Sequence, residues 1–150
     1  MIGGALGDTL TGNTLNNVLS GGAGNDTLAG GSGKNILIGG TGTDTLTGGV
    51  GEDLMLGARY TSETNSVALT SLLAEWTSAN SYAVRVANLL GVLTSTTVKE
   101  DAAKDTLTGG NGAGNRDWYL RNSQGAVVAN RDTVSDTDAD SVFTEISTWL

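Results

Sequence analysis

Residues 3–56 read GGALGDTLT, GNTLNNVLS, GGAGNDTLA, GGSGKNILI, GGTGTDTLT and GGVGEDLML, six consecutive nonapeptides without a gap. Their common pattern is G-G-x-G-x-D/N-x-U-x, where U is a large apolar residue. The first copy departs from it at Leu6, and the second at Asn13 and Leu15, where glycine is expected. Short repeats of this kind are typical of solenoids, whose terminal copies are often atypical.

The U position is the only one that is large and apolar in every copy, at Leu10, Leu19, Leu28, Leu37, Leu46 and Met55. Side chains alternate along a strand, so a short strand x-U-x directs one side chain inward and two outward. Successive strands are therefore predicted to stack into two parallel sheets, with two nonapeptides per coil and turns that alternate between two edges. The predicted fold is all-β, a parallel β-roll or two-sheet solenoid with a thin core.

The turns between these strands carry the groups that a cation needs. Gly-Gly-x-Gly permits backbone conformations open only to glycine, so several carbonyl oxygens can face one point, and the aspartate adds a carboxylate. Calcium accepts about six to eight oxygen ligands at flexible spacing, whereas magnesium prefers a tight octahedron and zinc prefers His or Cys. The chain has no His and no Cys. The predicted cofactor is several Ca²⁺ ions; the alternative is a glycine-rich solenoid whose Asp and Asn only cap their own turns.

The two edges of the roll are predicted to differ in charge. The first, third and fifth copies turn on one edge, hereafter the odd edge, and contribute Asp8, Asp26 and Asp44. The other three copies turn on the even edge and contribute Asn17, Asn35 and Asp53. An asparagine offers a carbonyl oxygen without charge, and calcium affinity falls with ligand charge. We therefore expect Asn17 and Asn35 to be weak or empty metal positions, held as an amide ladder.

Residues 61–100 break the repeat and have helical periodicity. Apolar residues at i, i+3, i+4 and i+7 predict one amphipathic helix through Leu69, Leu72, Leu73 and Trp76. Ser81 is predicted to be the N-cap of a second helix, with Gly91 as its C′ residue. The expected role of this helical hairpin is to cover an open end or face of the roll. The alternative is a docking surface for another protein, anchored by Trp76.

The repeat resumes at Asp105, and a stretched copy from Gly109 leads to Asp117. If the coil phase survives the insertion, Asp105 stacks on Asp44 and Asp117 on Asp53. The predicted metal ligands are then the carboxylates of Asp8, Asp26, Asp44, Asp53, Asp105 and Asp117, with the carbonyl oxygens of Gly22, Gly24, Gly40, Gly42, Gly49, Gly51, Gly110 and Gly112. The expected organisation is one structural unit: a roll in 1–60, a helical insertion in 61–100, and a resumed repeat with an acidic C-terminal cap in 101–150.

The G-G-x-G-x-D-x-U-x copies resemble the RTX, or haemolysin-type, calcium-binding repeat family. The resemblance implies ions that sit between stacked turns and share their carboxylates. It also implies secretion by type I machinery through an uncleaved C-terminal signal, for which the acidic segment 132–150 is the candidate; a surface strand or cap is the alternative. The run LLAEWTSANSYAVRVANL from Leu72, followed by TTV, DTLTGGNG and DWYL, resembles the C-terminal module of very large secreted proteins of Planctomycetes and related bacteria.

The composition favours a binding module over an enzyme. A net charge of −8 with only 8 Lys and Arg argues against nucleic acid as a partner. The absence of His, Cys and a Gly-x-Ser-x-Gly motif removes the common catalytic constellations, and no apolar run is long enough to span a membrane. The predicted function is a calcium-binding module that folds on binding calcium, at the C-terminal end of a secreted bacterial protein, and aids export and extracellular stability. The alternatives are an adhesion or self-assembly module and a non-catalytic appendage of a secreted hydrolase.

Overall fold

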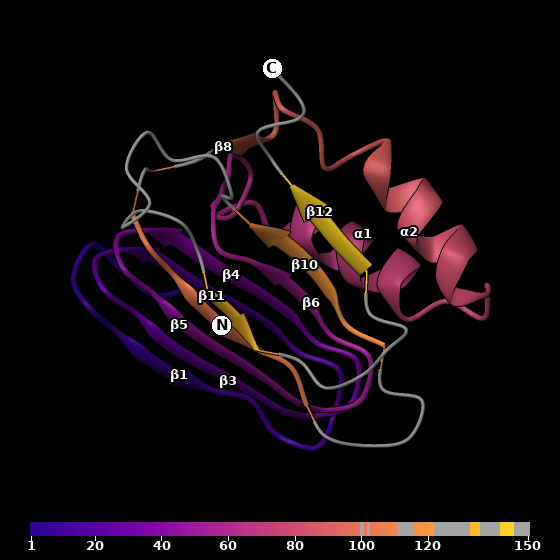
Figure 1. Ribbon diagram of the computed structural model, residues 1–150, viewed down its shortest axis with the longest axis horizontal. Coiled ribbons are helices and arrows are strands. Elements are labelled where there is room, and N and C mark those ends of the chain that lie inside the picture. Colours follow the sequence, from indigo (N-terminus) through magenta and orange to yellow (C-terminus); the bar gives the residue numbers. More distant parts are fainter. Residues whose placement is uncertain (100, 102, 111–115, 122–132, 136–141, 146–150) are drawn as a thin grey trace.

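The computed structural model describes residues 1–99, 101, 103–110, 116–121, 133–135 and 142–145. Two parallel sheets of five strands each stack face to face (Figure 1). The threonine sheet contains, in order, β1 (Thr9–Thr11), β3 (Thr27–Ser32), β5 (Thr45–Val50), β9 (Thr106–Thr108) and β11 (Thr133–Ser135). The helix-covered sheet contains β2 (Val18–Ala23), β4 (Ile36–Thr41), β6 (Leu54–Leu56), β10 (Trp118–Arg121) and β12 (Val142–Glu145). The predicted parallel β-roll is confirmed.

The inner core of the roll consists of one apolar residue per strand. Leu28 pairs with Leu46 in one sheet, and Leu37 pairs with Met55 in the other, so equivalent positions of successive coils lie side by side. Five of the six predicted U residues and two residues of the resumed repeat are fully or nearly fully buried: Leu19, Leu28, Leu37, Leu46, Met55, Leu107 and Tyr119. The sixth predicted residue, Leu10, is partly buried and packs against them. The core is therefore as thin as the x-U-x pattern requires.

The outer faces of the two sheets have opposite character. On the threonine sheet the flanking positions, such as Thr9, Thr27 and Thr45, are exposed. On β4, β6 and β10 of the helix-covered sheet the flanking positions are apolar and fully buried: Ile36, Ile38, Leu54, Leu56, Trp118 and Leu120. Burial of this second apolar face requires a cover, and the inserted residues supply it.

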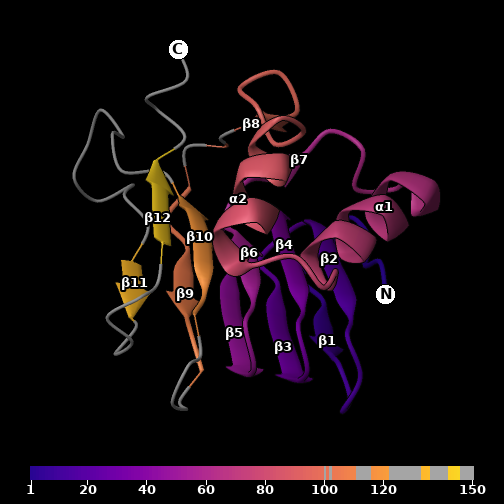
Figure 2. The same cartoon turned by 90° about the vertical axis from the view of Figure 1, so that its right-hand side faces the viewer.

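Two helices of the insertion cover that face (Figure 2). α1 (Ser66–Trp76) begins after Asn65, whose Oδ1 accepts hydrogen bonds from the N–H groups of Val67 and Ala68 at 3.0 and 3.1 Å. α2 (Tyr82–Leu90) begins after Ser81, as predicted, although the Ser81 side chain makes no capping hydrogen bond. Gly91 is the C-cap residue rather than C′ and keeps a right-handed φ of −72°. A short antiparallel pair, β7 (Arg59–Tyr60) with β8 (Val98–Lys99), closes the insertion at its base.

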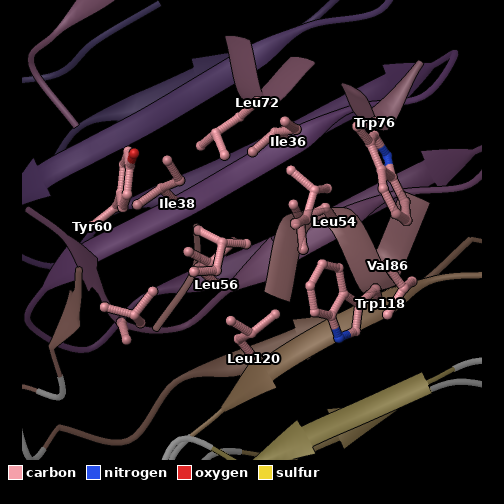
Figure 3. Packing of buried hydrophobic residues seen from close by; sticks show 14 of the residues in the cluster. Ile36, Ile38, Leu54, Leu56, Tyr60, Leu72, Trp76, Val86, Trp118 and Leu120 are labelled. Atoms are coloured by element: carbon pink, nitrogen blue, oxygen red, sulfur yellow. The ribbon is translucent and has the colours of Figure 1, made fainter. Parts of the chain in front are cut away.

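The helices pack on the sheet through aromatic and aliphatic side chains (Figure 3). Trp76 is fully buried, and its ring centroid lies 6.2 Å from that of Trp118. In the structure the hairpin lies on one face of the roll. The alternative of a docking surface anchored by Trp76 is wrong, because this side chain already belongs to the core between α1, α2 and the sheet.

The insertion leaves the phase of the coil unchanged. Thr45 pairs with Thr106, and Leu54 pairs with Trp118, in the register of the earlier coils. β11 and β12 come from the segment for which a cap was predicted, and they add one further strand to each sheet. Among the described residues, no helix has the length and apolar character needed to cross a membrane.

Candidate metal centre

The aspartates of the odd edge form a continuous hydrogen-bonded column. Oδ1 of Asp26 accepts a hydrogen bond from the main-chain N–H of Asp8 at 2.7 Å, and Oδ1 of Asp44 accepts one from Asp26 at 2.8 Å. Oδ1 of Asp105 continues the series with the N–H of Asp44 at 2.8 Å, so the stacking expected of Asp105 is present. The turn before Asp105 belongs to the insertion, and there the Asp101 carboxylate accepts a hydrogen bond from the N–H of Gly42.

The even edge has the same ladder with a different composition. Oδ1 of Asn35 accepts from the N–H of Asn17 at 2.9 Å, and Oδ1 of Asp53 accepts from the N–H of Asn35 at 2.7 Å. Oδ1 of Asp117 accepts from the N–H of Asp53 at 2.7 Å, so Asp117 also stacks as expected. The edges thus share one backbone geometry and differ in side-chain charge.

The ladder uses one carboxylate oxygen and leaves the other for a ligand. Asp26 and Asp53 are 2% and 0% exposed, and Oδ2 of each is buried without a hydrogen-bond partner among the described residues. At Asp8 and Asp117, by contrast, Oδ2 accepts from the N–H groups of Gly4 and Gly110 at 2.6 and 3.2 Å. A buried carboxylate oxygen without a partner costs free energy that a cation can offset. The oxygens of Asp26 and Asp53 therefore fit a metal ligand.

The turns contain positive-φ glycines, and one carbonyl oxygen, that of Gly39, lies close to the Asp26 carboxylate, although Gly39 is not among the predicted donors. The six predicted donors Gly22, Gly24, Gly40, Gly42, Gly49 and Gly51 all have φ between 105° and 127°, a region that L-residues rarely adopt. A Cβ on Gly21 would lie 2.2 Å from Asp26 Oδ2 and 2.5 Å from the Gly39 carbonyl oxygen of the next coil. The space beside Gly21 is thus lined by one carboxylate and one carbonyl oxygen from adjacent coils, which is the hard-oxygen chemistry that calcium prefers. Gly112 lies outside the described residues.

One buried aspartate on each edge has a raised pKa. Burial raises the pKa of Asp26, and the neighbouring Asp8 carboxylate raises it further. Burial also raises the pKa of Asp53 to about 7, with an added contribution from Asp117. Both shifts mean that the folded chain disfavours the ionised form, which is the form that binds calcium. A bound cation would reverse this balance.

The predicted amide ladder of the even edge is present. Nδ2 of Asn17 donates to Oδ1 of Asn35 at 3.1 Å and also to the carbonyl oxygen of Leu15. Nδ2 of Asn35 donates weakly, at 3.4 Å, to the carbonyl oxygens of Ser32 and Gly33 in its own turn. The amide N–H groups therefore contact turn carbonyls in the copies that lack the carboxylate.

A buried charge cluster beside Asp53 was not predicted from the sequence. The Glu52 carboxylate contacts Arg85 of α2, Lys34 Nζ at 2.9 Å and Arg116 at 2.6 Å. Although burial raises the pKa of Glu52, hydrogen bonds from these three cations lower it to about 2. Glu52 occupies a variable position of the nonapeptide, so no spacing in the sequence indicates its partners.

The same cluster ties the helical hairpin to the even edge. Trp76 Nε1 donates to the carbonyl oxygen of Glu52 at 3.0 Å, and the Tyr82 hydroxyl donates to the carbonyl oxygen of Asp117 at 2.8 Å. Arg85 lies 4.9 Å from the Trp76 ring centroid and is 1% exposed. The protein thus supplies cations to Glu52, the residue before Asp53, whereas no described cationic side chain pairs with Asp26.

Gly40→Ala tests the turn geometry. Gly40 has φ of 108°, and a Cβ there would lie 2.0 Å from the Gly22 carbonyl oxygen. We expect a loss of about 2–4 kcal/mol in the free energy of unfolding, measured by denaturation in saturating calcium, from backbone strain and overpacking. Gly91→Ala is the control and should change stability by less than about 1 kcal/mol, because Gly91 is right-handed. Equal stabilities of the two variants would contradict the described stacking of carbonyls.

The comparisons with known proteins agree with this geometry. The family model of the RTX calcium-binding nonapeptide repeat matches residues 2–37 and 30–59, in four copies. The search of curated proteins gave no match. The resemblance of the later region to the Planctomycetes module stays a prediction. RTX nonapeptide repeats bind Ca²⁺ ions and are typical of secreted proteins. Residues 2–59 of this chain, which contain the first three coils of the roll, are therefore RTX calcium-binding nonapeptide repeats.

Proposed function

We propose that this chain is a module that folds when it binds calcium, in a protein that a bacterium exports. The observation that carries the proposal is the column of stacked aspartates on the odd edge, in which Asp26 is 2% exposed and Oδ2 has no partner among the described residues. The ions are assigned to the spaces between successive turns. The calcium-binding repeat is typical of secreted proteins, and the role in export is part of the proposal.

The two edges are proposed to bind different numbers of calcium ions. On the odd edge, Asp8, Asp26, Asp44 and Asp105 would hold ions together with the carbonyl oxygens of Gly22, Gly24, Gly40 and Gly42. On the even edge, Asp53 and Asp117 would form the acidic pair, with the carbonyls of Gly49, Gly51, Gly110 and Gly112. The space between Asn17 and Asn35 would stay empty, because amide N–H groups already contact the carbonyls of its turns.

The coupling of folding to calcium follows from charge and burial. When calcium is scarce, folding requires the burial of like-charged carboxylates within a core that is one side chain thick per strand. Bound calcium supplies the positive charge that neutralises the column, so the free energy of binding becomes free energy of folding. Low calcium inside the cell would keep the chain export-competent, and millimolar calcium outside would fold it. A type I secretion machinery is the proposed partner for export.

A calcium titration followed by far-UV circular dichroism tests the proposal. We expect the β signal to develop as calcium rises into the millimolar range and to disappear on addition of EDTA. Magnesium at the same concentration is the control and should not restore the signal, because it accommodates the mixed carboxylate and carbonyl geometry poorly. A spectrum and a thermal midpoint that EDTA leaves unchanged would refute calcium-coupled folding.

Adhesion or self-assembly is the second candidate, favoured by one surface. Thr9, Thr27, Thr45 and Thr106 lie in register on four neighbouring strands, and all are exposed. Such a row offers a flat, regularly hydroxylated face. Light scattering as a function of calcium concentration tests this candidate, since growth of particles with calcium would support it and a constant monomer mass would exclude it.

A further inference from the structure

The outer surface of the helical hairpin is almost without charge. Between Tyr60 and Val98 the acidic and basic side chains are Glu63, Glu75 and Arg85. Glu63 and Arg85 are 6% and 1% exposed, so Glu75 is the one charged group of this segment at the surface. About a quarter to a third of the residues on a soluble protein surface are ordinarily charged. The net charge of −8 therefore lies elsewhere on the chain.

A groove opens on this surface between the two helices. It encloses a cavity of about 300 Å³ whose lining is mainly apolar. Leu72 of α1 and Leu89 of α2 lie beneath it together with Tyr60, and all three are buried. Ala68 and Val92 line it as well. The groove is thus an apolar depression on the side of the hairpin that faces the solvent.

Exposed valines border the groove. Val67 is 74% exposed and precedes the groove residue Ser71 by four positions in α1. Val84 is 45% exposed and precedes the groove residue Asn88 by four positions in α2. Residues four apart on a helix are neighbours on one face, so both valines flank the groove. Apolar ridges beside an apolar groove form a surface that can complement itself about a two-fold axis.

The polar end of the groove is satisfied within the chain. Oε1 of Glu75 accepts hydrogen bonds from Nδ2 of Asn88 at 2.8 Å and of Asn80 at 3.4 Å. Glu75 therefore has amide partners without a basic group from another molecule. Two copies of an acidic chain repel each other least where the charge is lowest, and the centres of protein interfaces are likewise depleted of charged residues. Both arguments favour a second copy as the occupant.

We propose that the outer face of α1 and α2, with Val67, Val84 and Val92, docks against the same face of a second copy of this chain. The valines of each copy would enter the groove of the other, and the contact would be two-fold symmetric. The proposal does not depend on calcium-coupled folding. It also differs from self-assembly through the threonine sheet, whose outer face lies on the other side of the roll.

The size of the face sets the strength of this dimer. α1 and α2 contain 11 and 9 residues. At the usual rise and diameter of a helix they are about 16 and 14 Å long and together present about 300 Å² per copy. A stable complex buries about 800 Å² per partner. The dimer is therefore expected to be weak and to form as the protein concentration rises.

Sedimentation velocity in saturating calcium tests the dimer. The wild type should shift from the mass of one chain to that of two between micromolar and millimolar concentration. Val84→Glu should raise the dimer dissociation constant at least about tenfold, because each dimer would bury two unpaired carboxylates. Val84 is the third residue of α2, where a carboxylate suits the helix dipole, so the circular-dichroism spectrum should not change. Val67→Glu, in the first turn of α1, should act in the same way.

Thr45→Glu is the matched control, since it adds the same charge on the exposed face of the threonine sheet and should leave the dimer intact. The proposal would be overturned by a single-chain mass at every concentration, by a dimer that both valine variants leave intact, or by an equal loss in Thr45→Glu. The two proposals can fail separately. A dimer that persists in EDTA with an unchanged fold would keep this contact and remove calcium-coupled folding. A single-chain mass together with EDTA-induced unfolding would do the reverse.

Discussion

Asp26→Asn is expected to destabilise the calcium-loaded protein strongly and the calcium-free protein not at all. Asp26 stands between Asp8 and Asp44 in the column, so its carboxylate borders two of the proposed ion positions. If each position binds with a Kd of about 0.1 mM, about 10 mM calcium stabilises the fold by about 2.7 kcal/mol per ion. Weakening both positions therefore costs up to about 5 kcal/mol, measured by urea denaturation in calcium.

The substitution should not lower the stability of the calcium-free protein. Burial raises the pKa of Asp26, and the Asp8 carboxylate adds to the rise, so the ionised side chain opposes folding when no cation is bound. Asparagine removes that charge and keeps Oδ1 as the acceptor for the N–H of Asp8. The calcium concentration at the folding midpoint should consequently rise, while any residual stability in EDTA should stay equal or increase.

Asn35→Asp is the reciprocal control on the even edge. Asn35 is fully buried, and the Oδ1 of Asp53 accepts from its N–H. A carboxylate at position 35 would create a second acidic pair on this edge, so the variant should bind calcium more tightly and be less stable in EDTA. If Asp26→Asn instead lost the same free energy with and without calcium, the aspartates would act only as caps of their own turns.

Glu52→Gln is expected to cost the calcium-loaded protein about 3 kcal/mol, because breaking a buried ion pair leaves the partner charge uncompensated. Arg85, at 1% exposure, would lose its carboxylate partner and keep the Trp76 carbonyl oxygen and the faces of Trp76 and Tyr82. Trp76 and Trp118 lie in the core between the hairpin and the sheet, so tryptophan fluorescence during urea unfolding measures the loss.

The stability contributed by Glu52 should also depend on pH in a defined direction. The folded chain holds the pKa of Glu52 at about 2, below its ordinary value. The contribution is therefore complete above the ordinary glutamate pKa of about 4.3 and is lost as the pH falls from there through about 2. The Glu52→Gln variant should lack this part of the acid dependence. Glu75→Gln, on the exposed face, should change stability by about 0.5 kcal/mol or less, and an equal effect of the two variants would contradict a buried role for Glu52.

Much of the roll could be predicted because its contacts repeat along the chain. Each coil contains two nonapeptides, so residues such as Leu28 and Leu46, or Asp26 and Asp44, meet at a constant separation in the sequence. The spacing alone therefore predicted the inner core, the two edges and the unequal distribution of Asp and Asn. The stacking of Asp105 and Asp117 could also be predicted. An inserted segment that lies outside the coil leaves the register of the following coil unchanged.

The sequence also distinguishes the outer faces of the two sheets. The fourth and sixth copies have apolar residues on both sides of U, in Ile36-Leu37-Ile38 and Leu54-Met55-Leu56, whereas odd copies such as Thr45-Leu46-Thr47 have threonine. Strand alternation makes those flanking residues an outer face, so the contrast indicates which sheet the hairpin must cover. The same contrast explains why the core between hairpin and sheet contains more residues than the core inside the roll.

The sequence by itself determined the β-roll, its calcium-binding chemistry and the charge difference between its edges, because each rests on interactions that recur with the repeat. Only the tertiary structure decided how the insertion joins the roll. Glu52 pairs with Arg85 and Arg116, and the Tyr82 hydroxyl donates to the carbonyl oxygen of Asp117, at sequence separations that no period relates. These contacts depend on how the side chains of α1 and α2 pack on one apolar face of the sheet, and the sequence repeat does not specify that packing.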